Sequence, residues 1–194
     1  MTNKLSESPE PMTVLEVGGL DLQIIEEPNF RLDSLGPTFK INVTFTINES
    51  MEGCGYIFRL TSSKNRYADY PRLKICQPSQ FNDNQWTMRV KYNFDADPVN
   101  ENKRKISHYV RNFNKKHLGK PFNMIIQQVQ IEDELRLQVF SGPNHKLVID
   151  DDRIVPVVKD VDVWVSEFTG SKYEKEAASG IMNSLSITTP FNEM

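Results

Sequence analysis

The chain has 194 residues, of which 38% are hydrophobic and 25% charged, and its formal net charge is −3 at pH 7. This composition is that of a globular protein with one well-buried core, and the length is short for two ordinary domains. The slightly acidic balance excludes a whole-chain electrostatic reason to bind nucleic acid. No apolar run approaches the length of a membrane span, and the first residues lack the apolar core of a signal peptide. We therefore expect a cytoplasmic or nuclear protein with no membrane partner.

The ends of the chain differ in composition from the middle. Residues 1–12 are polar and contain Pro9 and Pro11, so they are expected to form a disordered leader. A single domain is expected over residues 13–188, and residues 189–194 form a C-terminal tail.

Strands are expected where apolar and polar residues alternate with period two. Residues 13–17 and 20–25 are predicted as two strands, with a turn at Gly18 and Gly19 between them. The segment Phe39 to Ile47 alternates without a break, so one of its faces must be buried. Further alternating segments occupy residues 56–60, 72–76 and 86–94.

The period-two alternation of apolar and polar residues stops between residues 100 and 118. Ile106, Tyr109, Val110 and Phe113 are spaced i, i+3, i+4 and i+7, which predicts an amphipathic helix inserted between strands. Its polar face is basic, and it could bind a protein partner, RNA or another polyanion, or could simply be solvated. The candidate partner-binding residues on this helix are Lys103, Arg104, Tyr109, Arg111, Lys115 and Lys116.

A hairpin is predicted over residues 119–142, with its turn at the acidic residues 132–134. One face of the hairpin is apolar and needs a second sheet to cover it. Residues 146–149, 160–165 and 180–187 are predicted as further strands. The fold class expected is therefore all-β, an antiparallel two-sheet sandwich with an inserted amphipathic helix near residues 100–118.

Residues with catalytic or metal-binding chemistry show no matching pattern. Cys54 and Cys76 have no partners at zinc-ligand spacing and are interpreted as two buried thiols. The histidines have no nucleophile at a recognisable motif, and the acidic turns lack the spacing of a calcium loop. We expect no enzyme activity, no metal and no cofactor.

Five segments together resemble the galectin family. They are residues 39–45, 119–126 with their Gly-Lys-Pro-Phe opening, 135–142, 152–156 and 180–187. The resemblance spans about residues 14–187 and implies a jelly-roll sandwich that binds β-galactosides without metal or catalysis.

The sugar-binding pattern of that family is largely unmatched here. The family uses a His-x-Asn-x-Arg strand, then an Asn, then a Trp-x-x-Glu-x-Arg strand. Arg89 replaces the glutamate and can only donate hydrogen bonds, so the usual lactose network cannot form. The residues of this chain at the corresponding positions, which are the candidate ligand-binding residues, are Arg59, Thr61, Ser63, Gln77, Trp86, Arg89 and Lys91.

Two functional hypotheses follow. The first is a non-catalytic galectin-like module that mediates protein–protein interaction, through the altered groove or through the basic helix. The alternative is a glycan-binding lectin with altered specificity, in which Arg89 and Lys91 suit a sulfated or sialylated sugar. Trp86 could stack on a sugar or belong to the core, and Trp164 is equally ambiguous. The sequence leaves both a monomer and a homodimer as alternatives for the oligomeric state.

Overall fold

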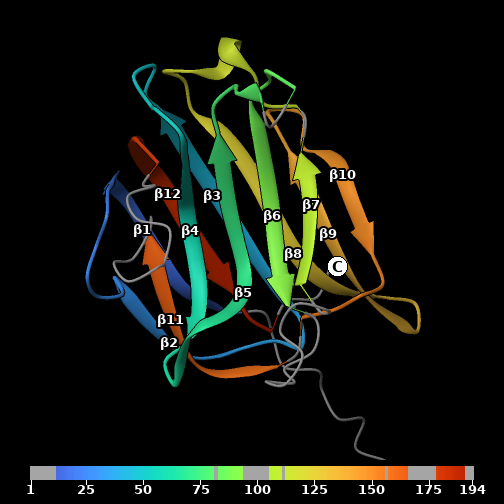
Figure 1. The fold of residues 1–194 in the computed structure, drawn as a ribbon. Helices are drawn as coiled ribbons and strands as arrows, with labels where there is room; N and C mark the ends of the chain where they lie inside the picture. Colours follow the sequence, from blue (N-terminus) through green and yellow to red (C-terminus); the bar gives the residue numbers. More distant parts are fainter. Residues whose placement is uncertain are drawn as a thin grey trace, which may run out of the picture.

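The computed structural model describes residues 12–80, 83–93, 105–110, 112–155, 157–165 and 178–190. In these residues two antiparallel six-stranded sheets pack face to face (Figure 1). Sheet I has the order β1 (Thr13–Leu22), β12 (Gly180–Thr188), β3 (Phe39–Ile47), β8 (Phe122–Ile131), β9 (Glu134–Ser141) and β10 (Lys146–Asp151). Sheet II has the order β2 (Phe30–Leu35), β11 (Val158–Val165), β4 (Cys54–Ser62), β5 (Asn65–Cys76), β6 (Thr87–Asn93) and β7 (Lys105–Val110). The expected all-β sandwich is confirmed.

The core lies between the sheets and follows the predicted alternation. All five odd-numbered side chains of β3, from Phe39 to Ile47, are fully buried. Met124 and Ile126 of β8 and Val139 of β9 are buried opposite them on the same sheet face. Because side chains alternate along a strand, the intervening residues must point away from the core.

The N-terminal strands differ from the prediction. β1 is one strand that continues through Gly18 and Gly19 and pairs with β12, so the predicted turn is wrong. A Cβ at Gly18 would lie 2.5 Å from the carbonyl oxygen of Asn183, and Gly19 has a φ of +70°. Glycine is therefore needed here for close strand approach and for backbone shape. β2, which pairs with β11, was not predicted at all.

The predicted inserted helix is wrong for the described residues. β7 pairs with β6, and a short 3₁₀ turn, η3 (Lys115–His117), follows it. Ile106 and Val110 are buried and Tyr109 is exposed, as the alternation of an edge strand requires. Residues 94–104 and 111 lie outside the described residues. Across the described ranges, no helix has the length and apolar character that a membrane crossing needs.

The two cysteines form a disulfide, so their interpretation as separate thiols is wrong. Cys54 and Cys76 lie directly opposite each other in the β4–β5 pair, with Cα atoms 4.0 Å apart. The sequence gives no indication of this pairing, because it depends on the register of two strands.

A polar cluster joins the open edges of the two sheets. Tyr92 of β6 donates to Oδ2 of Asp151 at 3.0 Å, and Nε2 of His108 on β7 lies 2.7 Å from the same oxygen. Nη2 of Arg153 donates a hydrogen bond to Oδ2 of Asp151 at 2.7 Å. The Arg153 hydrogen bond, aided by those from its backbone, His108 and Tyr92, holds the pKa of Asp151 well below its ordinary value, although burial opposes this. Burial and the nearby carboxylate raise the pKa of Tyr92.

We predict that Asp151→Asn lowers the free energy of unfolding by about 2–4 kcal/mol, because a buried charged acceptor is lost. Since the pKa of Asp151 is lowered in the folded protein, its stabilisation is present above the unfolded pKa of about 4 and disappears as the pH falls below that value. Urea denaturation from pH 7 to pH 3 measures both effects, and the difference between the variant and the wild type should begin to narrow below about pH 4. Asp150→Asn, on the exposed neighbour that pairs with Arg136, is the control. Equal losses in the two variants would contradict the prediction.

We also predict that the double variant Cys54→Ser with Cys76→Ser is less stable by about 3 kcal/mol, as expected for a loop of this length. The cysteines are separated by 22 residues. Urea denaturation of the variant and of reduced wild-type protein should give similar midpoints. Two titratable thiols in the folded, unreduced protein would show that the bridge is absent.

Candidate functional site

The outer face of sheet II is defined by the side chains that do not enter the core. A bulge between Tyr56 and Phe58 places both Ile57 and Phe58 in the core. Tyr56 and Arg59 consequently lie on the same outer face although they are three residues apart. This shift in alternation sets which residues of β4 face outward.

One row of outward residues crosses four neighbouring strands. Trp164 of β11 lies opposite Arg59 of β4, and Arg59 lies opposite Arg72 of β5. Arg72 in turn lies opposite Lys91 of β6. Side chains directly opposite each other in antiparallel strands are neighbours, so three cations stand in line.

A second row runs beside the first. Tyr56 of β4 lies opposite Lys74 of β5, Lys74 opposite Arg89 of β6, and Arg89 opposite Tyr109 of β7. The cations of the two rows form the feature that we call the cationic face. Its members are Arg59, Arg72, Lys74, Arg89 and Lys91.

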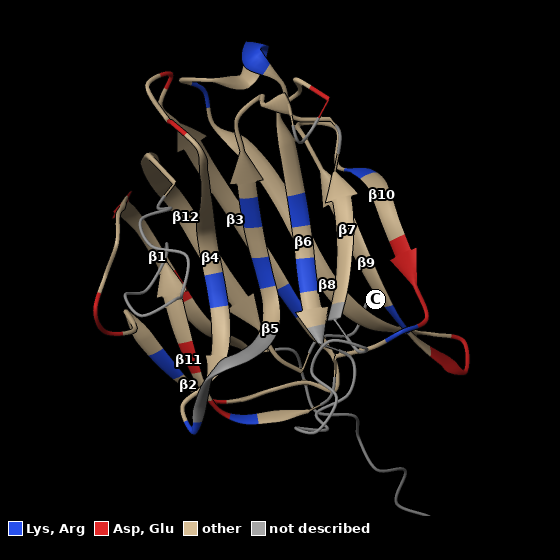
Figure 2. Cartoon of the chain, in the orientation of Figure 1, with Lys and Arg blue, Asp and Glu red and all other residues tan. Residues whose placement is uncertain are grey.

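The cationic face is visible as blue bands on β4, β5 and β6 (Figure 2). No Asp or Glu occurs in β4, in residues 70–76 of β5 or in β6. The whole chain is acidic, with a net charge of −3, so the positive charge here is a local concentration.

Aromatic rings lie among these cations. The guanidinium carbons of Arg59 and Arg72 and the ammonium of Lys74 are 4.8, 5.1 and 5.3 Å from the centre of the Tyr56 ring. The guanidinium of Arg89 lies 4.3 Å from the ring centre of Tyr109. These separations are in the cation–π range, and the rings help to hold like charges close together.

Exposure divides the cationic face into two parts. Arg59 and Arg72 are buried, whereas Lys74, Arg89 and Lys91 are partly exposed. Nε of Arg89 is enclosed and has no hydrogen-bond partner. Tyr109 is 47% exposed. The accessible part therefore lies over β5, β6 and β7.

On the other side of Arg59 the outer face contains an ordered tryptophan. Trp164 is buried, and its indole Nε1 donates to Oγ1 of Thr61 at 2.8 Å. Its neighbours on β11, Val163 and Val165, point into the core instead. Trp164 is thus an outer-face residue that is fixed in place.

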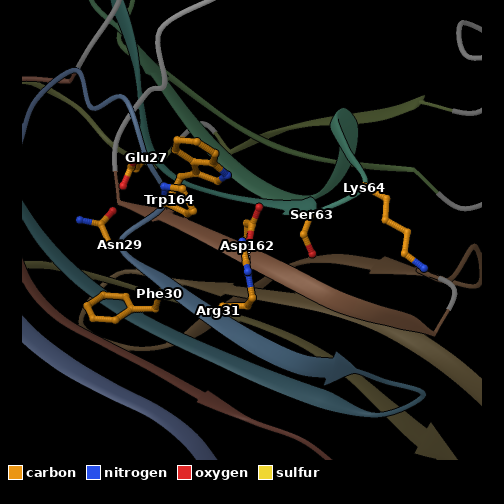
Figure 3. Close-up of a pocket in the computed structure, with 9 residues that line it drawn as sticks. Glu27, Asn29, Phe30, Arg31, Ser63, Lys64, Asp162 and Trp164 are labelled. Atoms are coloured by element: carbon orange, nitrogen blue, oxygen red, sulfur yellow. Dashed lines mark hydrogen bonds and ion pairs between the residues drawn. The ribbon is translucent and has the colours of Figure 1, made fainter.

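A surface pocket of about 670 Å³ lies next to Trp164, over β2, β11 and the β4–β5 turn (Figure 3). Its central feature is an ion pair in which Nε of Arg31 lies 2.8 Å from Oδ1 of Asp162. The Asp162 carboxylate raises the pKa of Arg31 above its ordinary value. The described residues that line the pocket are Glu27, Pro28, Asn29, Phe30, Arg31, Ser63, Lys64, Asp162 and Trp164.

The structure brings together four of the seven residues predicted for the groove. Arg59, Thr61, Arg89 and Lys91 all lie on the outer face of sheet II. Ser63 lies beyond β4, where its hydroxyl donates to the carbonyl of Asp160, and it lines the pocket.

The other two predicted groove residues lie away from this face. Trp86 points to the core side and packs edge-on against Phe113, with ring centres 5.8 Å apart. Gln77 lies past the end of β5, where its backbone N–H donates to the carbonyl of Gly53 at 2.9 Å. Stacking of a ligand on Trp86 at this face is therefore incompatible with its position.

The described residues predicted for the basic helix belong to two different elements, neither of them an α-helix. Tyr109 belongs to the outer face of sheet II, and Lys115 and Lys116 are exposed in η3. Lys103, Arg104 and Arg111 lie outside the described residues.

Sequence reasoning missed Tyr56, Arg72 and Lys74 of the outer face and Asp162 of the pocket. Arg72 and Lys74 alternate with the core residues Leu73 and Ile75, so period two alone could have found them. Within the described residues, no group of three or more His, Cys, Asp or Glu side chains could hold a metal ion.

No protein-family model matches this chain, and no curated protein matches its sequence. Solved structures do match its fold. The alginate lyase Aly36B has a TM-score of 0.57 at 10% identity, covering 84% of this chain and 73% of that chain. The Ruminococcus gnavus IT-sialidase CBM40 bound to α2,3 sialyllactose has a TM-score of 0.53 at 8% identity, covering 91% of each chain.

Galectins are also among the structural neighbours. Xenopus laevis galectin-Ib has a TM-score of 0.44 at 11% identity, covering 87% of this chain and 98% of that chain. At such identities the likeness concerns the fold alone. The all-β antiparallel two-sheet sandwich implied by the sequence resemblance is confirmed.

We predict that Thr61→Val and Trp164→Phe each destabilise the protein by about 1–3 kcal/mol. Each substitution removes one partner of the buried hydrogen bond from the indole to the Thr61 hydroxyl and leaves the other partner without it. The double variant should lose less than the sum of the single losses, by about 1 kcal/mol. Urea denaturation of the four proteins in a double-mutant cycle measures this coupling energy. Additive losses would show that the bond does not stabilise the fold.

Proposed function

We propose that the outer face of sheet II binds an anionic glycan. The observation that carries this proposal is the alignment of five cations in two neighbouring rows among aromatic rings. Guanidinium groups bind carboxylate and sulfate groups with two parallel hydrogen bonds, and lysine adds a mobile positive charge. Tyrosine faces suit the apolar faces of sugar rings.

Electrostatics favours an anion at this place. Positive side chains in opposite positions of neighbouring strands concentrate positive charge, which attracts an anion. The partly exposed Lys74, Arg89 and Lys91 give an anion access.

A neutral β-galactoside is a poorer ligand for the same residues. Arginine and lysine side chains donate hydrogen bonds but cannot accept them. Sugar hydroxyls bind best where a site both donates and accepts, and Arg89 occupies the position at which the sequence resemblance calls for a glutamate.

The fold neighbours support the same class of ligand. One is an alginate lyase and another is a sialidase module bound to sialyllactose, and both alginate and sialyllactose are acidic carbohydrates. The fold alone does not determine the ligand, so the cationic face carries the argument.

The protein-interaction hypothesis offered two surfaces, the altered groove and the inserted helix, and the described residues do not form that helix. We propose binding rather than catalysis, because the described histidines lie away from the cationic face. His108 belongs to the Asp151 cluster, His117 packs on Phe113 in η3, and His145 lies in the β9–β10 turn.

The disulfide supports an encounter with glycans outside a reducing compartment. Disulfides persist in oxidising environments such as the cell surface, and are rare in the cytosol. The Cys54–Cys76 bridge lies at the ends of β4 and β5. It therefore favours an oxidising location over the cytoplasm or nucleus expected from the sequence.

The proposal predicts that α2,3-sialyllactose, 3′-sulfated lactose or an alginate trisaccharide binds more tightly than lactose. The double variant Arg89→Gln with Lys91→Gln should weaken that binding at least tenfold, a loss of about 1.4 kcal/mol. Isothermal titration calorimetry at low salt measures it, and added salt should weaken wild-type binding further.

The matched control is Lys115→Gln with Lys116→Gln, which removes two exposed positive charges away from sheet II. This control should leave glycan affinity unchanged. Equal weakening in both double variants would indicate general charge attraction, and no binding of any acidic glycan would refute the proposal.

A further inference from the structure

The pocket beside Trp164 offers the hydrogen-bond acceptor that the cationic face lacks. Asp162 of β11 is on the outer face of sheet II, in the row Arg31, Asp162 and Thr61. β4 and β6 contain no Asp or Glu, and β11 contains only Asp160 and Asp162. Of these two, Asp162 lies closer to the cationic face, because it pairs with Thr61 of β4. An ionised carboxylate accepts hydrogen bonds and donates none, so it complements arginine and lysine, which only donate.

Arg31 holds this carboxylate in a fixed orientation. The contact uses Oδ1 of Asp162 at 2.8 Å, and no described residue donates a hydrogen bond to Oδ2. The side chain of Asp162 is 8% exposed, whereas that of Arg31 is 65% exposed. A ligand hydroxyl can therefore meet a preoriented acceptor with a donor beside it.

The other polar residues of the pocket can complete a hydroxyl-binding set. Oδ1 of Asn29 accepts the backbone N–H of Val165 at 2.7 Å, so the nitrogen of the same amide is the group that can donate to a ligand. Ser63 and Lys64 lie on the other side of Asp162 (Figure 3). Trp164 provides an apolar wall. Mixed donors and acceptors on an apolar wall are typical of sites for polar, uncharged ligands.

The pocket and the cationic face lie on one sheet at a distance suited to an oligosaccharide. From β11 the order of strands is β4, β5 and β6. Two to three inter-strand spacings across the sheet and two rows along the strands separate Asp162 from Lys74 and Arg89, which is about 16–20 Å. A single sugar ring does not span this distance, whereas a short oligosaccharide does.

We infer that the pocket lined by Asn29, Arg31, Ser63 and Asp162 is a second subsite, which takes an uncharged, hydroxyl-bearing sugar unit of the ligand whose acidic unit lies on the cationic face. This inference rests on the proposed function and narrows the ligand class. It selects oligosaccharides that join an acidic sugar to a neutral one over polymers that are acidic in every unit.

Two pairs of probes test the inference by calorimetry. One pair is the methyl glycoside of sialic acid and α2,3-sialyllactose, and the other is galactose 3-sulfate and 3′-sulfated lactose. Within at least one pair, the member with the added neutral unit should bind about fivefold or more tightly, a gain of about 1 kcal/mol. The pair that shows the gain identifies whether the acid is a carboxylate or a sulfate.

Asp162→Asn should remove this gain and leave the affinity for the smaller acidic probe unchanged. Arg31→Gln, a substitution of an exposed side chain, should reduce the gain in the same direction. Asp133→Asn, in the exposed turn between β8 and β9 of sheet I, is the matched control and should leave both affinities unchanged.

The outcomes separate the two proposals. If both members of each pair bind equally, or if Asp162→Asn weakens both members alike, the second subsite is refuted while an anionic site stands. If no acidic probe binds at all, the proposed function itself fails, and the second subsite fails with it.

Discussion

The alternation of side chains between the two faces of sheet II, regular over residues 72–76 of β5 and along β6 and shifted by a bulge in β4, is the constraint on which the rest of the structure depends. The sandwich buries Leu73, Ile75, Met88 and Val90 against sheet I, because apolar burial is the dominant favourable contribution to folding. Once these residues face inward, their neighbours can only face outward. The cationic face is thus a geometric consequence of core formation, and its charges are held in rows by the backbone pairing that the core requires.

The strands could be predicted from sequence where the alternation is long and unbroken, as in β3, because a buried face leaves a period-two pattern. The helix prediction failed over residues 105–110 because Ile106 and Val110, four residues apart, fit one face of a helix and one face of a strand equally well. Pairing with β6 decides between them, and it is a tertiary interaction that local spacing does not contain. β1 was divided in the prediction for a similar reason, since Gly18 allows close approach to β12 as well as a turn.

Some residues of the candidate site could be predicted from the sequence and others could not. Alternation from Met88 to Tyr92 was sufficient to place Arg89 and Lys91 on one face, whereas Trp86 was left open between a sugar-stacking and a core position until the structure placed it against the core. The neighbours of these residues could not be predicted, because they depend on the register of β5 against β4 and β6. The Cys54–Cys76 bridge and the position of Tyr56 depend on the same register and on the bulge in β4.

Donors and acceptors are distributed unequally across the outer face, and this distribution limits the ligands it can take. The rows over β5 and β6 contain only donors, so they stabilise negative charge and discriminate poorly among hydroxyl groups. The braced carboxylate of Asp162 can distinguish hydroxyl geometry, but it would repel an acidic group. Because the two kinds of chemistry lie on separate strands of one sheet face, with β4 between them, a ligand that satisfies both must carry its charge at one end.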